Sequence, residues 1–244
     1  MTMNDNEEKT IKPVAWFKSP FSSKFGIPRQ SGVVEELEGR IILAPEFARE
    51  EATRGLEGFD YLWLIWGFSG NEGKWSLTVR PPRLGGNKSV GVFASRSPFR
   101  PNGLGLSSAR IVSIDLKSPH GPEITVAGAD LMDGTPIYDI KPYIRYSDSH
   151  PQAVSGFTDG TAWKEAMVDF PEALEKEFRK RSGADDQDVK ALTRTLAQRP
   201  VPQYSHDTER IYGMPFMGCD IKFRAGEDTI TVTGIETIKD IDSK

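Results

Sequence analysis

From Val14 to about Tyr143 the chain is a series of short apolar stretches separated by glycine, proline and asparagine. The stretches are VAWF, GVVEEL, RIILA, DYLWLIWGF, WSLTVR, VGVFAS, LGLSSARIVSI, EITVAGADL and PIYDI. Many short strands with turn residues between them are typical of an all-β sandwich or barrel. The pattern therefore predicts a mainly β structure for this part of the chain.

Two local features of the β part can be predicted more closely. The segment GVVEELEGRIILA, residues 32–44, indicates a hairpin that turns at residues 38–40. A helix is expected from about Pro45 to Arg54, because a proline lies near its start, acidic residues occupy its first turn and Gly55 follows its end.

The pattern changes after about His150. Residues 171–183 and 185–200 each predict a helix, since apolar residues recur on one face and capping residues stand at the ends. Two strands are expected at residues 217–224 and 229–235. We therefore expect two domains, a β domain at residues 12–150 and a smaller α+β domain at residues 151–244.

The bulk composition indicates a globular protein outside the membrane. The chain has 244 residues, of which 37% are hydrophobic, enough for a substantial core. No secretory signal is expected in the polar opening, and the longest apolar run, YLWLIWGF, is too short to span a bilayer. The predicted location is the cytoplasm.

The cysteine and histidine content argues against a metal site. Cys219 is the single cysteine and stands in an apolar context, which predicts a buried strand residue. His120, His150 and His206 match no spacing used for zinc. No metal is expected.

Charge is distributed unevenly along the chain. The net charge is -4, yet no acidic residue occurs between Gly73 and Ile114. The basic residues of that segment are Lys74, Arg80, Arg83, Lys88, Arg96, Arg100 and Arg110. A segment of one charge sign inside an acidic protein indicates a surface that faces phosphate. The alternative is that these side chains spread around a barrel rim and pair with acids from elsewhere.

The usual nucleotide-binding motifs are absent. GLGLSS, residues 103–108, approaches a dinucleotide fingerprint, but a strand pattern follows it instead of a helix. GNEGKW, residues 70–75, lacks the glycine spacing and the Ser or Thr of a P-loop. A Ser-His-Asp arrangement stays open, although no nucleophile elbow is present.

Four loops combine proline and glycine with basic or acidic residues, namely residues 24–32, 78–89, 95–103 and 130–143. Proline fixes the backbone, while glycine allows it to approach a ligand closely. Such loops suit a binding site at one end of a barrel, although each of them could also be a simple connection between strands.

Three of these loops resemble motifs of a known family. RPPRLGG, GVFASRSPFRPN followed by GLS, and DLMDGTPIYDIKPY are similar to the motifs of the TsaA-like tRNA methyltransferases, the TrmO group. RPVPQY, IYGMPF and CDIKF resemble the C-terminal extension of its longer bacterial members. The resemblance implies a single-sheeted antiparallel β-barrel that binds S-adenosylmethionine, commonly as a homodimer. The implied activity is N6-methylation of threonylcarbamoyladenosine beside the tRNA anticodon.

The resemblance also implies site residues. The expected cofactor contacts are Pro28, Arg29, Gln30, Phe68, Ser69, Arg96, Leu106, Asp133, Gly134 and Thr135. Ser69 departs from the family, many of whose members carry a histidine there. Arg29 and Arg96 are suited to bind a carboxylate through two parallel hydrogen bonds.

The remaining expectations concern catalysis and RNA binding. If a general base is needed, Asp133 is the first candidate and Asp139 or Tyr138 the reserve, although Asp133 could instead only form an Asx turn. Arg80, Arg83, Lys88 and Arg100 are the candidate phosphate contacts, with Arg100 alternatively holding its own loop. From the residues alone, an RNA-binding barrel without catalysis and a small-molecule hydrolase or isomerase stay open.

Overall fold

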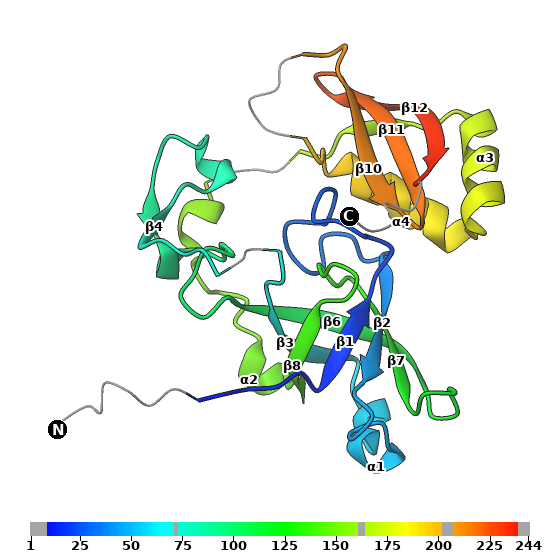
Figure 1. The fold of residues 1–244 in the computed structure, drawn as a ribbon. Coiled ribbons are helices and arrows are strands. Elements are labelled where there is room, and N and C mark those ends of the chain that lie inside the picture. Colours follow the sequence, from blue (N-terminus) through cyan, green and yellow to red (C-terminus); the bar gives the residue numbers. More distant parts are fainter. Residues whose placement is uncertain (1–8, 71–72, 161–163, 202–206, 239–244) are drawn as a thin grey trace.

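The computed structural model describes residues 9–70, 73–160, 164–201 and 207–238 (Figure 1). His206 and the second half of the RPVPQY motif, residues 202–204, lie outside these ranges. Figure 1 shows two bodies, one built around strands of the first part of the chain and the other around strands and helices of its C-terminal part.

The first body is one antiparallel sheet of six strands with the order β1-β2-β7-β6-β3-β8. The strands are β1 (Ala15–Lys18), β2 (Glu38–Leu43), β3 (Tyr61–Gly67), β6 (Leu104–Asp115), β7 (Glu123–Ala127) and β8 (Pro136–Pro142). The two end strands of this order also pair, Ala15 with Ile137 and Trp16 with Pro136. The contact that would close the expected barrel consists of these two residue pairs and of neighbouring backbone hydrogen bonds, such as that from the Phe17 amide to the Thr135 carbonyl at 2.9 Å.

Alternation along the strands explains the core of this sheet. In β2 and β3 every second side chain is buried, because neighbouring side chains in a strand point to opposite faces. The fully buried residues include Ile41, Leu62, Leu64, Ile124 and Ile137. The predicted mainly β fold is confirmed.

The hairpin predicted at residues 38–40 is wrong. Glu38–Leu43 is one continuous strand, and residues 32–37 form turns before it. Gly39 serves packing instead, because a Cβ at this position would lie 2.3 Å from Cζ of Phe17. The helix expected over residues 45–54 is shorter than predicted: α1 covers only Glu50–Thr53, and a 3-10 turn follows at Leu56–Gly58.

The second body is an α+β unit, as predicted. Its elements are β9 (Met167–Asp169), α3 (Glu172–Ser182), α4 (Asp186–Ala197), β10 (Ile211–Phe216), β11 (Cys219–Ala225) and β12 (Thr229–Thr237). The sheet order is β10-β11-β12-β9, so the sequence missed β9 and β10. Cys219 is buried on β11, which confirms its predicted environment.

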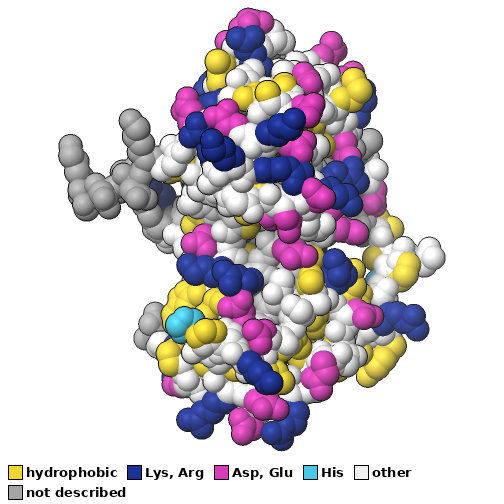
Figure 2. Space-filling view, turned by 90° about the vertical axis from the view of Figure 1, so that its right-hand side faces the viewer, with side chains coloured by type: hydrophobic (Ala, Val, Ile, Leu, Met, Phe, Trp, Pro, Cys, Tyr) yellow, Lys and Arg dark blue, Asp and Glu magenta, His cyan; other side chains and the backbone are white. Residues whose placement is uncertain are grey.

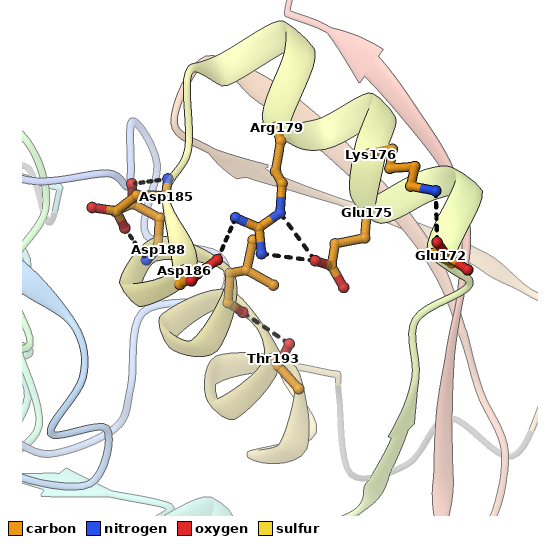
Figure 3. A network of polar contacts seen from close by, with 9 residues as sticks. Glu172, Glu175, Lys176, Arg179, Asp185, Asp186, Asp188 and Thr193 are labelled. Carbon is orange, nitrogen blue, oxygen red and sulfur yellow. Dashed lines mark hydrogen bonds and ion pairs between the residues drawn. The ribbon is translucent and has the colours of Figure 1, made fainter.

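Helix α3 ends and helix α4 begins where the sequence indicates. Gly183 follows α3 in a left-handed conformation, and its amide bonds to the Arg179 carbonyl. Asp185 caps α4, since its side chain and that of Asp188 each accept a backbone amide of the other residue. Figure 3 shows this capping pair beside Arg179, which contacts Glu175 and Asp186 and so links the two helices.

A segment of the first 40 residues belongs to the core of the second body. Phe21, Val34 and Leu37 are buried together with Phe178, Leu192, Phe216 and other residues of the α+β unit. The Met217 amide also donates to the Pro20 carbonyl at 2.9 Å. The sequence did not predict that the N-terminal segment packs into this core. The domain boundary near residue 150 stays a prediction.

Part of the basic segment forms a small separate hairpin. Strands β4 (Thr78–Val79) and β5 (Val90–Gly91) pair with each other, with 3-10 turns at Pro82–Leu84 and Val92–Ala94. Figure 1 shows β4 on the left, away from both larger sheets. Figure 2 shows the side of the molecule that lies on the right in Figure 1. On this face basic and acidic side chains are interspersed, unlike the one-sign charge of the basic segment.

Two further short elements follow β8, namely α2 (Arg145–Asp148) and a 3-10 turn at Gly156–Thr158. No helix in the described part of the chain is long and apolar enough to cross a bilayer. The cytoplasmic location stays a prediction.

Candidate cofactor and RNA site

A cavity of about 630 Å³ opens at the edge of the six-stranded sheet where β3 ends and β6 and β8 begin. Trp66 and Phe68 come from the end of β3, and their rings meet edge-on at 4.4 Å between centroids. Residues 24–30 and 96–100 supply two loops of the wall. Its size lies within the roughly 300–1,000 Å³ that is usual for small-molecule sites.

Most of the residues expected to contact a cofactor meet at this cavity. Those that line it are Pro28, Arg29, Gln30, Phe68, Ser69, Arg96, Leu106 and Thr135. They come from loops and strands that are far apart in the sequence, so the fold alone brings them together. Ser69, at the position where the family often has histidine, also lines it.

Asp133 and Gly134 are not among the lining residues. Oδ1 of Asp133 accepts the Ser19 amide at 3.1 Å, and Oδ2 lies 3.5 Å from Nζ of Lys18. Gly134 has φ 74° and its amide donates to the Phe17 carbonyl. These contacts hold the turn before β8 against the end of β1. They are not those of an Asx turn, because Asp133 accepts the distant Ser19 amide while the Thr135 amide donates to the Met132 carbonyl at 3.2 Å.

The reserve candidates for a general base also lie outside the main cavity. Asp139 pairs with Nζ of Lys141 at 2.9 Å and accepts the Ile140 amide. Tyr138 lines a second cavity of about 300 Å³, which shares Phe68, Ser69, Arg100 and Leu104 with the first. Of the three base candidates, Tyr138 is thus the one that lines a cavity adjoining the main one.

Arg96 and Gln30 join the two wall loops. Nη1 of Arg96 donates to Oε1 of Gln30 at 2.6 Å, and Nε2 of Gln30 donates to the Arg29 carbonyl at 2.6 Å. Partial burial and then the positive charge of Arg83 lower the pKa of Arg29. Two mutually repelling guanidinium groups near one cavity favour an anion between or beside them.

Arg100 lines the cavity but also holds its own loop. Its Nε donates to the Ser97 carbonyl at 3.0 Å, and Nη2 donates to the carbonyls of Val92 and Ser95 at 3.1 and 2.6 Å. This favours the loop-structure alternative for Arg100.

Asp130, which the sequence did not single out, also lines the cavity. Oδ1 of Asp130 accepts from Oγ of Ser107 at 2.5 Å, and Ser107 in turn accepts from Nε1 of Trp66 at 3.0 Å. Burial raises the pKa of Asp130 against the opposing effects of Ser107, the backbone and Arg96. Asp130 stands three residues before Asp133 in the same motif, and only its buried environment distinguishes the two.

The other RNA candidates lie on the β4–β5 hairpin. Arg80 and Lys88 are exposed, and Arg83 is half-buried in the 3-10 turn between the strands. Aromatic rings are exposed in the same segment, with Trp75 at 55%, Phe93 at 83% and Phe99 at 46%. Basic groups interleaved with exposed rings suit a single-stranded nucleic acid, whose bases stack on such rings.

The described residues hold no group of three or more His, Cys, Asp and Glu side chains that could bind a metal ion. The side chains at the cavity carry ammonium, guanidinium, amide, hydroxyl and carboxylate groups, together with aromatic rings. This set suits an organic ligand that carries both charge signs.

Comparison with known proteins gives two family matches that together span most of the chain. Residues 16–149 match the tRNA-methyltransferase O N-terminal domain, and residues 164–238 match the TrmO C-terminal domain. A crystal structure of TrmO from Pseudomonas aeruginosa has a TM-score of 0.77 at 28% identity and covers 96% of this chain and 100% of its own.

Curated relatives are similar over nearly the whole length. The Escherichia coli K12 tRNA (adenine(37)-N6)-methyltransferase is 34% identical over 93% of this chain and 97% of its own. A Pseudomonas aeruginosa protein with the provisional name S-adenosylmethionine-dependent methyltransferase RcsF is 37% identical over 87% of this chain and 90% of its own.

Proposed function

Because the chain belongs to the tRNA-methyltransferase O family, we propose that its main cavity holds S-adenosylmethionine and presents it to adenine 37 of tRNA. The protein is an S-adenosylmethionine-dependent tRNA adenine-N6 methyltransferase, as its relatives are named. The observation that carries the site assignment is the meeting of eight expected cofactor residues at one cavity of about 630 Å³.

The lining residues fit the parts of this cofactor. Arg29 and Arg96 can bind its carboxylate, and the rings of Trp66 and Phe68 offer apolar surface to its adenine. When bound, the cofactor would supply the methyl group of its sulfonium to N6, with the electron pair of the broken bond left on sulfur and the N6 proton released to water.

The protein's main contribution is to hold the reacting atoms at near-attack distance, roughly 3–3.5 Å. Pro28 and Pro98 stiffen the two wall loops, and the Arg96–Gln30 hydrogen bond ties these loops to each other. We propose that these stiffened loops position the cofactor.

We propose threonylcarbamoyladenosine as the preferred substrate nucleoside. A carbonyl on N6 makes its proton easier to lose, so a strong general base is unnecessary. The lack of a second acidic group among the described lining residues agrees with this chemistry.

The β4–β5 hairpin is proposed to contact the anticodon stem-loop through Arg80, Arg83 and Lys88, with help from the C-terminal unit. Arg83 supports this placement because its charge acts on Arg29 at the cavity. RNA on the hairpin would therefore lie close to the cofactor.

A homodimer is also proposed, since apolar side chains stay exposed on the sheet. Leu106 at the cavity is 55% exposed, Val112 on the same strand 39% and Trp16 on β1 41%. Light scattering after size-exclusion chromatography would give a mass of twice 27.1 kDa. A mass of one chain would reject the dimer.

The decisive experiment incubates the protein with methyl-labelled S-adenosylmethionine and tRNA, with or without the threonylcarbamoyl group, and analyses the nucleosides by mass spectrometry. We expect label on N6-methyl threonylcarbamoyladenosine from modified tRNA only. Label on unmodified adenosine would reject the substrate proposal. RNA binding without any transfer would favour the non-catalytic alternative.

A further inference from the structure

The walls of the main cavity are strongly cationic. Lys24, Arg29, Arg96 and Arg100 line it, and Asp130 is the one acidic residue among the described residues that do so. A ligand with a net positive charge would be repelled by such walls unless a carboxylate met its cationic part.

Asp130 is held in a fixed orientation at this wall. The chain of hydrogen bonds from Trp66 through Ser107 ends on its Oδ1, and Ser107 is only 1% exposed. A backbone hydrogen bond from Ser31 also favours the charged form. In the sequence, Ser31 directly follows Gln30 and Ser107 directly follows Leu106. Because both serines bond to Asp130, this carboxylate lies among the proposed cofactor contacts.

S-adenosylmethionine has a sulfonium and an ammonium group against one carboxylate, which leaves it a net cation near neutral pH. We propose that the Asp130 carboxylate is the counter-ion for the cationic part of the bound cofactor. This rests on the proposed function, and it assigns to Asp130 a binding role rather than that of proton acceptor for N6.

The counter-ion role makes cofactor binding depend on pH. Only ionised Asp130 attracts a cation, and burial raises its pKa from the ordinary value. Affinity should therefore be full well above the raised pKa and fall as the pH is lowered through it. The basic groups that line the same cavity are Lys24, Arg29, Arg96 and Arg100, and of these the Arg96 charge acts on the Asp130 carboxylate.

The first test measures dissociation constants of the full chain by titration calorimetry at neutral pH. Asp130→Asn should weaken S-adenosylmethionine binding by at least about tenfold, the scale of one lost charge-assisted hydrogen bond. Asp115→Asn is the matched control, because it removes the same charge from an exposed end of β6. Unchanged affinity in Asp130→Asn, with or without lost turnover, would overturn the counter-ion role.

S-adenosylhomocysteine locates the charge that Asp130 meets, since it keeps the ammonium but has a neutral sulfur. An equal loss of affinity for both ligands assigns the ammonium, and a smaller loss for S-adenosylhomocysteine assigns the sulfonium. Either result supports the counter-ion role. If the unaltered protein binds neither ligand, the proposed function fails, which is a separate outcome.

The second test follows affinity against pH in a variant that keeps the carboxylate. Ser107→Ala removes a hydrogen bond that lowers the pKa of Asp130, so its affinity should fall at a higher pH than in the unaltered protein. Asp130→Asn should lose this pH dependence. A fall at the same pH in all three proteins would contradict the proposal, and thermal melting checks that each variant is folded.

Discussion

The ring of Phe21, near the N-terminus, meets the ring of Phe216 on β10 edge-on at 5.2 Å between centroids. Both side chains are fully buried, at 0% and 1% exposure. Residues that are far apart in the sequence thus share one core, and the N-terminal segment is part of what stabilises the α+β unit.

Replacing Phe21 by Ala should destabilise this shared core. The loss of a fully buried ring and the cavity left behind typically cost about 3–5 kcal/mol. Urea unfolding, followed by circular dichroism, measures the change in the free energy of unfolding. Phe59→Ala is the control, because Phe59 is 38% exposed and should lose much less. A loss below about 1 kcal/mol for Phe21→Ala would show that the core tolerates its absence.

Gly105→Ala should impair cofactor binding through Trp66. A Cβ at Gly105 would lie 2.3 Å from Cε2 of Trp66, so the indole must move from its place at the cavity and from Ser107. We expect weaker S-adenosylmethionine binding by calorimetry and a shifted tryptophan emission. Gly58→Ala is the matched control, since a Cβ at Gly58 would meet nothing within 4 Å. Equal affinities in the two variants would contradict this role of Trp66.

Asp133→Asn tests the general-base hypothesis. Because Asp133 is bonded to the Ser19 amide and Lys18 outside the lining of the cavity, we expect a lower melting temperature and a single-turnover rate within about twofold of the original. Rapid-quench measurement under saturating cofactor gives that rate. A fall of about tenfold or more with cofactor affinity kept would instead assign the base role to Asp133.

Arg80→Gln combined with Lys88→Gln tests the RNA surface. If each side chain contacts one phosphate, the slope of log affinity against log salt concentration should fall by about one for each residue. Filter binding of tRNA over a range of potassium chloride concentrations measures this slope. Lys117→Gln, in the turn between β6 and β7 away from the cavity, should keep it. An unchanged slope in the double variant would place the RNA elsewhere.

The strands of the first body could be predicted because alternation of apolar residues is a local signal. Gly39 was misread as a turn residue, since its close contact with Phe17 depends on a neighbouring strand. Strand β10 was missed because IYGMPF contains both glycine and proline, which usually interrupt strands. Local patterns do not report such contacts between distant segments.

The candidate site shows the same limit. The expected cofactor residues were identified through motif resemblance, and the fold brings most of these residues to one cavity. Asp130 could not be distinguished from Asp133 by sequence, because its special environment comes from Ser107, Trp66 and Arg96 on other segments. The membership of Phe21 in the distant core had no sequence signal at all.

The loop that carries Pro28, Arg29 and Gln30 is anchored on both sides in the α+β unit, by Phe21 before it and Val34 after it. Any tilt of that unit would therefore pull directly on the wall of the cofactor cavity. If tRNA contacts the C-terminal unit as proposed, a shift of that unit on binding would reach the residues proposed to hold the methyl donor through this loop.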